Sequence, residues 1–328
     1  METNEFLDPF DRMLADLCPP ASVRAIEAGG DANAMWEVLE ESGFLDALVS
    51  EEEAGVGLEL AQVGPLLAAV GRHAMPLPGG ETMLARALLA GAGVARPRGP
   101  IVLASDLGGR SAAVPCGRVA RHVLIESEGR LVLTAAGALT VEPTGVAHDL
   151  GAVFAWNGAL VGRSMEAPEG GLLALGAALR ACLIAGASER LLDMTIAYAN
   201  ERVQFGKPIG RQQALQQNLA VMAEQVVATR LVAQTVCAFG LPVNPLAVAM
   251  AKQVAGSFAA PVANTAHAIH GAIGISEEYD LQLLSRRLHS WRLADGAEGL
   301  WAQKLGAARL NDPRSSIDFL RDLAPGLR

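Results

Sequence analysis

Apolar residues in the C-terminal half of the chain recur at helical spacing. In one segment they follow one another at intervals of three, four or seven residues and form a stripe down one helix face: Leu215, Leu219, Met222, Val226 and Ala233. Breaks that contain Gly or Pro separate four such segments, at residues 172–203, 212–239, 245–270 and 278–310. Four long helices with short connections predict an antiparallel four-helix bundle.

The first part of the chain is also predicted to be helical, over residues 5–95. Apolar residues near helical spacing run from Phe6 to Leu17, and Pro19 and Pro20 end that segment. Residues 100–165 differ, because short Val-, Leu- and Ile-rich runs alternate there with Gly, Ser and Asp. Such runs with hairpin-like breaks indicate a small β module of about four to six strands.

We therefore expect a mostly α protein with a central β module. The predicted parts are an N-terminal helical domain at 1–98, a reduced β domain at 99–168 and the four-helix bundle at 169–312. A tail at 313–328 contains Pro313 and Pro325 and is expected to fray.

Composition narrows the possible functions. Acidic residues outnumber basic ones by 35 to 26, and the net charge of −9 argues against nucleic-acid binding. The acidic start METNEFLDPFDRM lacks the apolar stretch of a signal peptide. No charge-free apolar run reaches the roughly 18 residues that span a membrane. The cysteines are far apart and form no CxxC pair, which is typical of reduced thiols. We expect a cytoplasmic protein with no membrane partner.

The stretch ERVQFGKPIGRQQALQQ, which begins at residue 201, combines groups that suit a phosphorylated ligand. Arg202 ends a helix, and its guanidinium can bind a diphosphate through two parallel hydrogen bonds. Phe205 is expected to pack under the turn, and Gly206 allows a backbone conformation that a side chain would block. Gln213 opens the next helix, whose first N–H groups are free. The plainer interpretation is an ordinary helix–turn–helix with an exposed arginine.

These residues resemble the acyl-CoA dehydrogenase family. The family signature is similar to Arg-x-x-Phe-Gly-x-x-Ile-Gly followed by Gln-x-x-Gln, as found here from Arg202 onward. GFLDALVSEEEAGVGL at 43–58 is similar to an N-terminal family loop, and HAIHGAIGISEEYDLQLLSRR at 267–287 resembles its late His-Gly-Gly-x-Gly turn. The resemblance covers nearly the whole chain and is strongest at 176–287.

The resemblance implies a dimer of dimers around FAD that removes hydrogens from Cα and Cβ of an acyl-CoA thioester. A carboxylate would take the α proton while the flavin takes the β hydride. By position, Arg202 would bind the flavin diphosphate of a neighbouring subunit, with Phe205 and Gly206 beside it. Gln213 would contact the cofactor at the start of the next helix. The late turn, with Gly271 and Gly274, would approach the adenine half of a neighbour's FAD.

The sequence departs from the family at its catalytic base. Where many members have Glu-Gly-Thr, this chain has Asp295-Gly296, and Glu298 lies one helical turn further on. The shorter Asp side chain would misplace the carboxylate, and small misplacements can cost roughly a hundredfold in rate. The alternative base position of some members falls near Gly176, which carries no carboxylate. Asp295 is thus a weak candidate base and Glu298 a weaker one.

The part that would hold the chain's own flavin is also reduced. The β domain is short, and Trp156 is the residue that could stand in for the family's flavin-facing stretch. Some bacterial members pair a full-length with a shortened subunit and are associated with CoA thioesters of bulky ring systems. This chain resembles the shortened subunit.

Three hypotheses follow for its function. The first is a small subunit of an FAD-dependent acyl-CoA dehydrogenase that works with acyl-CoA and with a larger homologous subunit or with itself. The second is a non-catalytic scaffold, and the third is a flavin-free CoA-thioester lyase or hydratase.

Two further sets of residues allow competing interpretations. His267 and His270 have i, i+3 spacing, but no other ligands have suitable spacing, so we expect no metal site. The late arginines Arg286, Arg287 and Arg292 either meet CoA phosphates or pair with the acids at 277–280.

Overall fold

The computed structural model describes residues 5–324. Its N-terminal part is helical as predicted, with the helices α1 (Leu7–Leu17), α2 (Pro20–Glu27), α3 (Asn33–Glu41), α4 (Leu60–Arg72) and α5 (Gly79–Gly91). Pro20 occupies the first turn of α2, where its missing N–H costs nothing. A reciprocal hydrogen-bond pair between Glu59 and Gln62 caps the start of α4.

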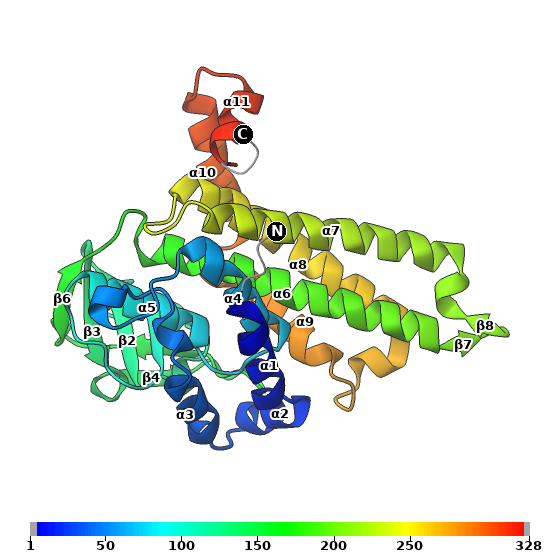
Figure 1. Ribbon diagram of the computed structural model, residues 1–328, viewed down its shortest axis with the longest axis horizontal. Coiled ribbons are helices and arrows are strands. Elements are labelled where there is room, and N and C mark those ends of the chain that lie inside the picture. The colour runs from blue at the N-terminus through cyan, green and yellow to red at the C-terminus, as the bar shows by residue number, and fades with distance from the viewer. Residues whose placement is uncertain (1–4, 325–328) are drawn as a thin grey trace.

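The β module contains two sheets that lie beside the helical body (Figure 1). The larger sheet has the strand order β1 (Ile101–Ser105), β2 (His122–Ser127), β3 (Arg130–Ala135) and β6 (Arg163–Glu166). The smaller one pairs β4 (Thr140–Pro143) with β5 (Ala152–Ala155). β2 and β3 form the expected hairpin, but β1 and β2 pair in parallel, so the break between those two runs is a crossover and not a hairpin turn.

The C-terminal part contains the long helices α6 (Gly171–Glu201), α7 (Gln213–Cys237) and α8 (Pro245–His270). The predicted fourth helix at 278–310 is wrong as a single element. It is two helices, α9 (Leu281–Leu293) and α10 (Glu298–Asn311). Asp295 and Gly296, between them, both have positive φ, of 54° and 89°. A right-handed helix cannot continue through that conformation.

Helix α6 runs through the centre of the body and packs directly on α4. Built Cβ atoms on Gly71 and Gly186 would overlap the carbonyls of Leu183 and Ala68 on the facing helix, so these positions require glycine. By length and composition alone, α6 and the segment Pro245–Ile275 could cross a membrane. The apolar window of α6 is 94% buried within the protein, as expected of a core helix, and that of the second segment is 56% buried.

The last part of the chain stands away from the body (Figure 1). There the predicted fraying tail contains a short helix, α11 (Ser316–Asp322), whose first turn is capped by the hydroxyl of Ser315. Residues 325–328 lie outside the described part. The predicted domain boundaries stay predictions.

Candidate functional site: the arginine hairpin and the closed carboxylate site

The stretch that begins at Arg202 folds as a small hairpin, which we call the arginine hairpin (Arg202–Pro208). Its strands β7 (Val203–Gln204) and β8 (Lys207–Pro208) are antiparallel. Phe205 and Gly206 form the tip, with φ of 52° and 77°. Two consecutive positive φ values are those of a type I′ turn. The expectation that Phe205 packs under this turn is wrong, because its side chain is 92% exposed. A two-residue turn leaves no surface beneath it to receive the ring.

Arg202 presents a free cation at the base of this hairpin, opposite Ile209. Its backbone N–H donates to the carbonyl of Tyr198 and so ends α6. Within residues 5–324 the exposed guanidinium has no hydrogen-bond or ion-pair partner. Gln213, also exposed, is the first residue of α7, where backbone N–H groups lack partners within the helix. The hairpin therefore offers an unpaired guanidinium and free donors to an anion from outside.

The late turn (Gly271–Ile275, a single 3₁₀ turn) lies at the same end of the bundle. Gly271 is exposed and has φ 61° and ψ −139°, a conformation that other residues avoid. Gly274 is buried, and a built Cβ would lie 2.8 Å from the Cβ of His270. A larger residue would therefore strain the backbone at Gly271 and would need movement of its neighbours at Gly274.

A separate hydrophobic cluster joins the two turns. Ala199 of α6, Ile209 after the hairpin and Ile269 of α8 are buried together. Tyr198, Leu215 and Leu219 pack against them. Because Gln213 begins the helix that carries Leu215, all the residues predicted to contact FAD lie on elements that meet at this cluster.

The carboxylate of the candidate base Asp295 is engaged in an ion pair. Its Oδ2 accepts a 2.9 Å hydrogen bond from Nε of Arg180, and Nη1 of Arg180 donates to Oε1 of Glu81 at 2.6 Å. The Arg180 side chain is only 3% exposed. Its burial lowers its pKa, but the carboxylates of Glu81 and Asp295 together raise it by more, so the guanidinium stays charged. Asp295, whose side chain is 21% exposed, is therefore an ion-pair partner in this arrangement and not a free base.

The two family positions for a base meet in space. A Cβ built on Gly176 of α6 would lie 2.6 Å from the carboxyl carbon of Asp295. Neither position offers a free carboxylate, because Gly176 has no side chain and Asp295 is held by Arg180.

Glu298 and Lys252 complete this closed site. Oε1 of Glu298 accepts from Arg292 at 2.9 Å, while its buried Oε2 has no partner among the described residues. The fully buried Lys252 donates to the carbonyls of Arg292 and Gly296, at 2.7 and 2.8 Å. Lys252 of α8 thus fixes the link between α9 and α10 through two hydrogen bonds to its backbone.

The late arginines pair with acids other than those expected. Arg286 and Arg287 both donate to the carboxylate of Glu27 on α2, at 2.7 and 2.8 Å. Neither binds the acids at 277–280 through an interaction found in the described residues, and Arg292 pairs with Glu298. Arg286 and Arg287 thus tie α2 to α9, whereas Arg292 ties α9 to α10.

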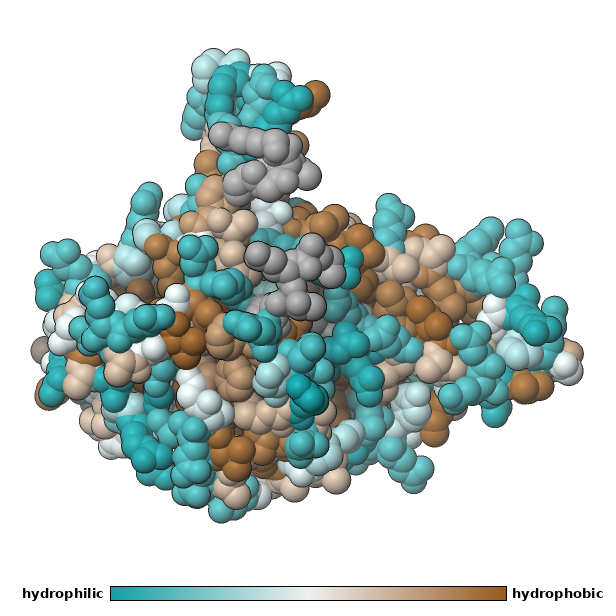
Figure 2. Space-filling view, viewed as in Figure 1, coloured by the Kyte–Doolittle hydropathy of each residue, from teal (hydrophilic) through white to brown (hydrophobic). Residues whose placement is uncertain are grey.

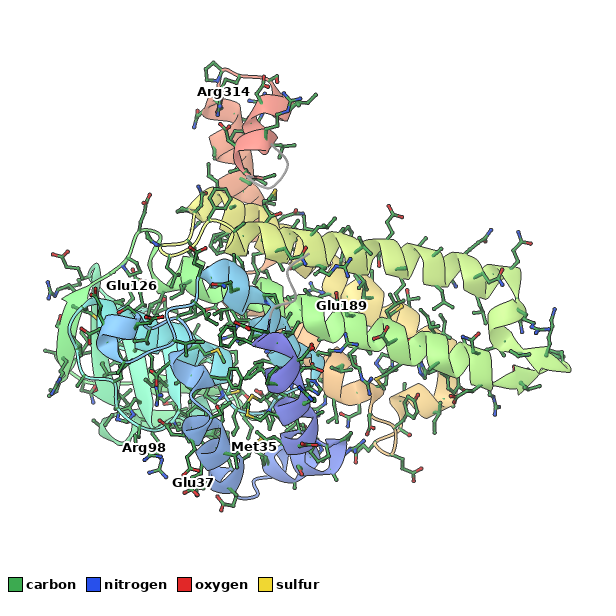
Figure 3. All side chains as sticks on the ribbon, in the orientation of Figure 1. Met35, Glu37, Arg98, Glu126, Glu189 and Arg314 are labelled. Carbon is green, nitrogen blue, oxygen red and sulfur yellow. The ribbon has the colours of Figure 1, made fainter. Side chains whose placement is uncertain are left out.

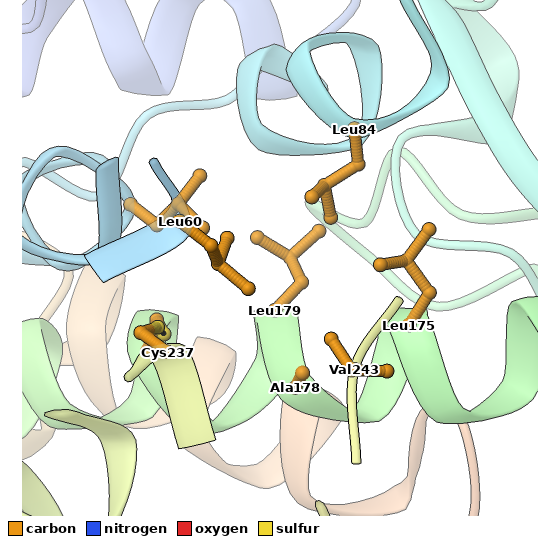
Figure 4. A pocket seen from close by; sticks show the side chains of 9 residues that line it. Leu60, Leu84, Leu175, Ala178, Leu179, Cys237 and Val243 are labelled. Carbon is orange, nitrogen blue, oxygen red and sulfur yellow. Dashed lines mark hydrogen bonds between the residues drawn. The ribbon is translucent and has the colours of Figure 1, made fainter. Parts of the chain in front are cut away.

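The cavity between α4, α5 and α6 holds only about 10 Å³ and is lined by apolar side chains that point toward one another, among them Leu60, Leu84, Leu175 and Leu179 (Figure 4). A larger hollow of about 630 Å³ lies between α1, α4, α6 and α7. Trp156, proposed to stand in beside a flavin, instead packs against the separate core of the β module.

The arginine hairpin and the closed site lie far apart. Gly176, beside Asp295, and Arg202 are both on α6 or at its end. The helix rises about 1.5 Å per residue, so roughly 39 Å separate them along its axis. An arginine at one end cannot serve chemistry at the other end of the same chain.

The residues fit half of an FAD site. The free guanidinium of Arg202, the first turn of α7 and the glycine-only backbone of Gly271 suit the diphosphate and adenosine of a dinucleotide. For the ring half, Asp295 is held in an ion pair and offers no free carboxylate, and Trp156 lies half-buried against the core of the β module.

Sequence reasoning missed Glu81, Arg180 and Lys252. A signal was present for Arg180 and Lys252, since each is a charged residue inside an apolar helical run, as in LGAALRACLIAG around Arg180, whereas Glu81 follows Pro-Gly-Gly at the start of a helix. A lone charge at such a place indicates a buried partner. The sequence does not say which carboxylate that partner is.

The fold is that of acyl-CoA dehydrogenases. The ChsE4–ChsE5 complex from Mycobacterium tuberculosis matches with a TM-score of 0.80 at 23% identity, covering 96% of this chain and 99% of that one. The Tcur3481–Tcur3483 steroid ACAD matches with a TM-score of 0.81, also at 23% identity, covering 92% and 96%.

Sequence similarity extends the likeness beyond the fold. The family model described as "Acyl-CoA dehydrogenase, C-terminal domain" matches residues 169–309. Acyl-CoA dehydrogenase IpdE2 of Mycolicibacterium smegmatis is 31% identical over 280 residues, which cover 82% of this chain and 86% of that protein. The chain belongs to the acyl-CoA dehydrogenase family.

Proposed function

We propose that this chain is the small subunit of an FAD-dependent acyl-CoA dehydrogenase built from two unlike, homologous chains. In this assembly it supplies contacts to the flavin diphosphate. The larger chain supplies the catalytic base and the acyl pocket. The complex would be a dimer of dimers in the cytoplasm, with an acyl-CoA thioester as its substrate.

One contrast carries the proposal. Arg202 is exposed and unpaired within residues 5–324, while Asp295 is held by a buried arginine. A chain that used its own base would need the opposite arrangement, with an open carboxylate beside its substrate. The contrast supports a chain that gives binding contacts to another chain's site.

The roles of this chain's residues follow from that contrast. FAD, when bound, accepts the β hydride of the thioester. Arg202 would bind the diphosphate through charge-assisted hydrogen bonds, and the first turn of α7 at Gln213 would donate to the same anion. Gly271 would let the late turn approach the adenine half closely. Phe205, fully exposed on the hairpin tip, would pack against the partner.

The proposed substrate is the CoA thioester of a bulky ring system. Supporting it, one of the matching structures is described as a steroid ACAD, and the other is a complex of two chains. The cavity between α4, α5 and α6 of this chain is too small for such a group, and the proposal places the acyl group in the larger chain.

The test is flavin binding by the co-expressed complex of this chain and its homologous partner. Arg202→Ala should weaken FAD binding by about 10- to 100-fold, the effect expected of one lost charge-assisted contact. Arg98→Ala is the matched control, because Arg98 is also exposed, has no partner among the described residues and points away from the body (Figure 3). Titration of FAD into each apo complex gives the Kd. An unchanged Kd in Arg202→Ala would reject the proposal.

The second candidate is a non-catalytic scaffold, favoured by the closed site at Glu81, Arg180 and Asp295. On that account the chain stabilises its partner and touches no flavin. The two candidates predict opposite results for Arg202→Ala in the titration.

A further inference from the structure

One residue links both turns of the proposed half-site, one turn through its backbone carbonyl and the other through its aromatic side chain. Tyr198, half-buried on the last turn of α6, lies one helical turn before Arg202. It also packs on His270, the residue immediately before Gly271 of the late turn. The two turns are remote in sequence, so a shared contact is what sets their relative position.

Hydrogen bonds connect Tyr198 to the backbone of both turns. Its carbonyl accepts from the N–H of Arg202 at 2.9 Å. Its hydroxyl donates to the carbonyl of His270 at 3.3 Å. A shift of Tyr198 would therefore move the start of the hairpin and the start of the late turn together.

Ring contacts fix the orientation of Tyr198. Its ring and that of His270 are stacked, with centroids 4.4 Å apart and planes 24° apart. Tyr279 approaches both rings, at 6.3 Å from Tyr198 and 5.1 Å from His270. Such arrangements stabilise aromatic pairs beyond their buried area.

His270 is held in one form. Its Nδ1 lies 2.8 Å from the carbonyl of Ala266, which can only accept, so Nδ1 carries the proton. Burial lowers the pKa of His270 despite that hydrogen bond. The ring on which Tyr198 stacks is therefore neutral near neutral pH and has a fixed orientation.

This end of the bundle depends on its own contacts. The cluster of Ala199, Ile209 and Ile269 is separate from the main core, and Tyr198 packs against it. Contact with the large core reaches the late turn through Leu281, next to Gly274, and through Tyr279, which packs against that core.

We propose that Tyr198 is a positioning residue of the dinucleotide half-site, which fixes the arginine hairpin relative to the late turn. The inference rests on the proposed function. It assigns to Tyr198 an effect on FAD affinity that acts through Arg202, without contact to the reacting atoms.

The experiment compares FAD Kd values in the co-expressed complex. Tyr198→Leu removes the stack and should weaken FAD binding by about tenfold. Tyr198→Phe keeps the ring and should stay within about threefold of the unaltered complex. In an Arg202→Ala background, Tyr198→Leu should weaken binding by less than about threefold, because coupled residues are not additive. Leu192 lies on the same helix as Tyr198 and is half-buried against the main core. Leu192→Ala is therefore the control for general destabilisation and should leave the Kd for FAD within about twofold of the unaltered value.

The outcomes separate the two proposals. If Arg202→Ala weakens binding and Tyr198→Leu does not, the positioning role is overturned and the proposed function stands. Fully multiplicative effects of the two substitutions would also overturn the role. If Arg202→Ala has no effect, the proposed function itself fails. Should Tyr198→Leu not assemble, Tyr279→Leu loosens the same cluster from outside, and a Kd equal to the unaltered value would overturn the role.

Discussion

Arg180 binds two carboxylates that come from distant parts of the chain. Glu81 lies on α5, and Asp295 lies in the link between α9 and α10. Both side chains of the Arg180–Glu81 pair are at most 5% exposed. Buried pairs of this kind gain little over apolar residues, but breaking one leaves an uncompensated charge.

Arg180→Met should therefore destabilise the protein strongly, by about 3–5 kcal/mol in the free energy of unfolding. Urea denaturation measures it. Adding Glu81→Gln should recover part of the loss, because it removes one unpaired carboxylate. Arg110→Met is the matched control, since the Arg110–Glu142 pair is more than half exposed on both sides. It should cost less than about 1 kcal/mol. Equal losses for both arginines would contradict a buried ion pair.

Lys252 is a buried amine with unusual protonation. Burial, its largest influence, lowers its pKa from 10.5 to about 8, although Asp295 and Glu298 partly oppose this. The unfolded chain therefore binds more protons than the folded one between pH 8 and 10.5. The contribution of Lys252 to the free energy of unfolding therefore rises with pH across that window. Below the window the contribution is constant and at its lowest.

Lys252→Met should remove this rise. The difference in unfolding free energy between the unaltered protein and Lys252→Met should grow by on the order of 3 kcal/mol in favour of the unaltered protein between pH 8 and 10.5. Urea unfolding at intervals across this range measures the difference, in which other titrating groups cancel. Parallel curves would show that Lys252 titrates normally.

Among the elements, the arginine hairpin lies at the far end of the long helices (Figure 1). Its tip carries Phe205 at positive φ and 92% exposed, which costs folding energy and gains nothing within the chain. A partner surface would give this ring a function.

Phe205→Gly should leave the melting temperature of the chain unchanged or slightly raised, because glycine accepts positive φ without strain. Association with the homologous partner should weaken by about tenfold or more, because an exposed aromatic anchor is lost. Native mass spectrometry during titration with the partner measures the amounts of the free chain and of the complex. Leu107→Gly, which removes another exposed apolar side chain in the β module, should not alter association. Equal association in both variants would exclude the hairpin from the interface.

The sequence predicts an element well where local periodicity determines it, and poorly where the backbone conformation of single residues or distant contacts determine it. Periodicity predicts α6, α7 and α8 within about two residues, because their apolar stripes are long. It fails at 278–310, since Asp295 and Gly296 break the helix through positive φ that periodicity does not register. It fails for Phe205 as well, because burial is a property of the surroundings.

The site follows the same division. Arg202 and Gly206 are predictable from charge and local backbone needs, whereas Gly271 is singled out through the family resemblance. The pairing of Asp295 with Arg180, by contrast, joins residues 115 positions apart. No local pattern specifies such a pair, so the sequence indicates a candidate base where the structure has an ion pair.

At the scale of the whole molecule, apolar side chains lie uncovered along the long helices. Val221, Val227 and Leu231 of α7 are 53%, 44% and 53% exposed, and hydrophobic residues are visible along this helix in Figure 2. Faces of this kind mark protein–protein contacts. They accord with the proposed dimer of dimers.

Replacing Val227 and Leu231 together by Glu should reduce the mass of the complex measured by light scattering, because charges would be buried in the contact. Val161→Glu, at an 82% exposed position of the β module, should leave the mass unchanged. If the complex keeps its mass with both α7 residues replaced, α7 is not part of the contact between subunits.

The most direct measurement of the central claim is an experimental structure of the FAD-loaded complex of this chain with its homologous partner. The account predicts the guanidinium of Arg202 within about 3 Å of the diphosphate oxygens of an FAD whose ring lies in the other chain. The Asp295–Arg180 pair should remain closed in the same structure. An arginine hairpin that faces solvent, away from FAD and from every other chain, would contradict the account.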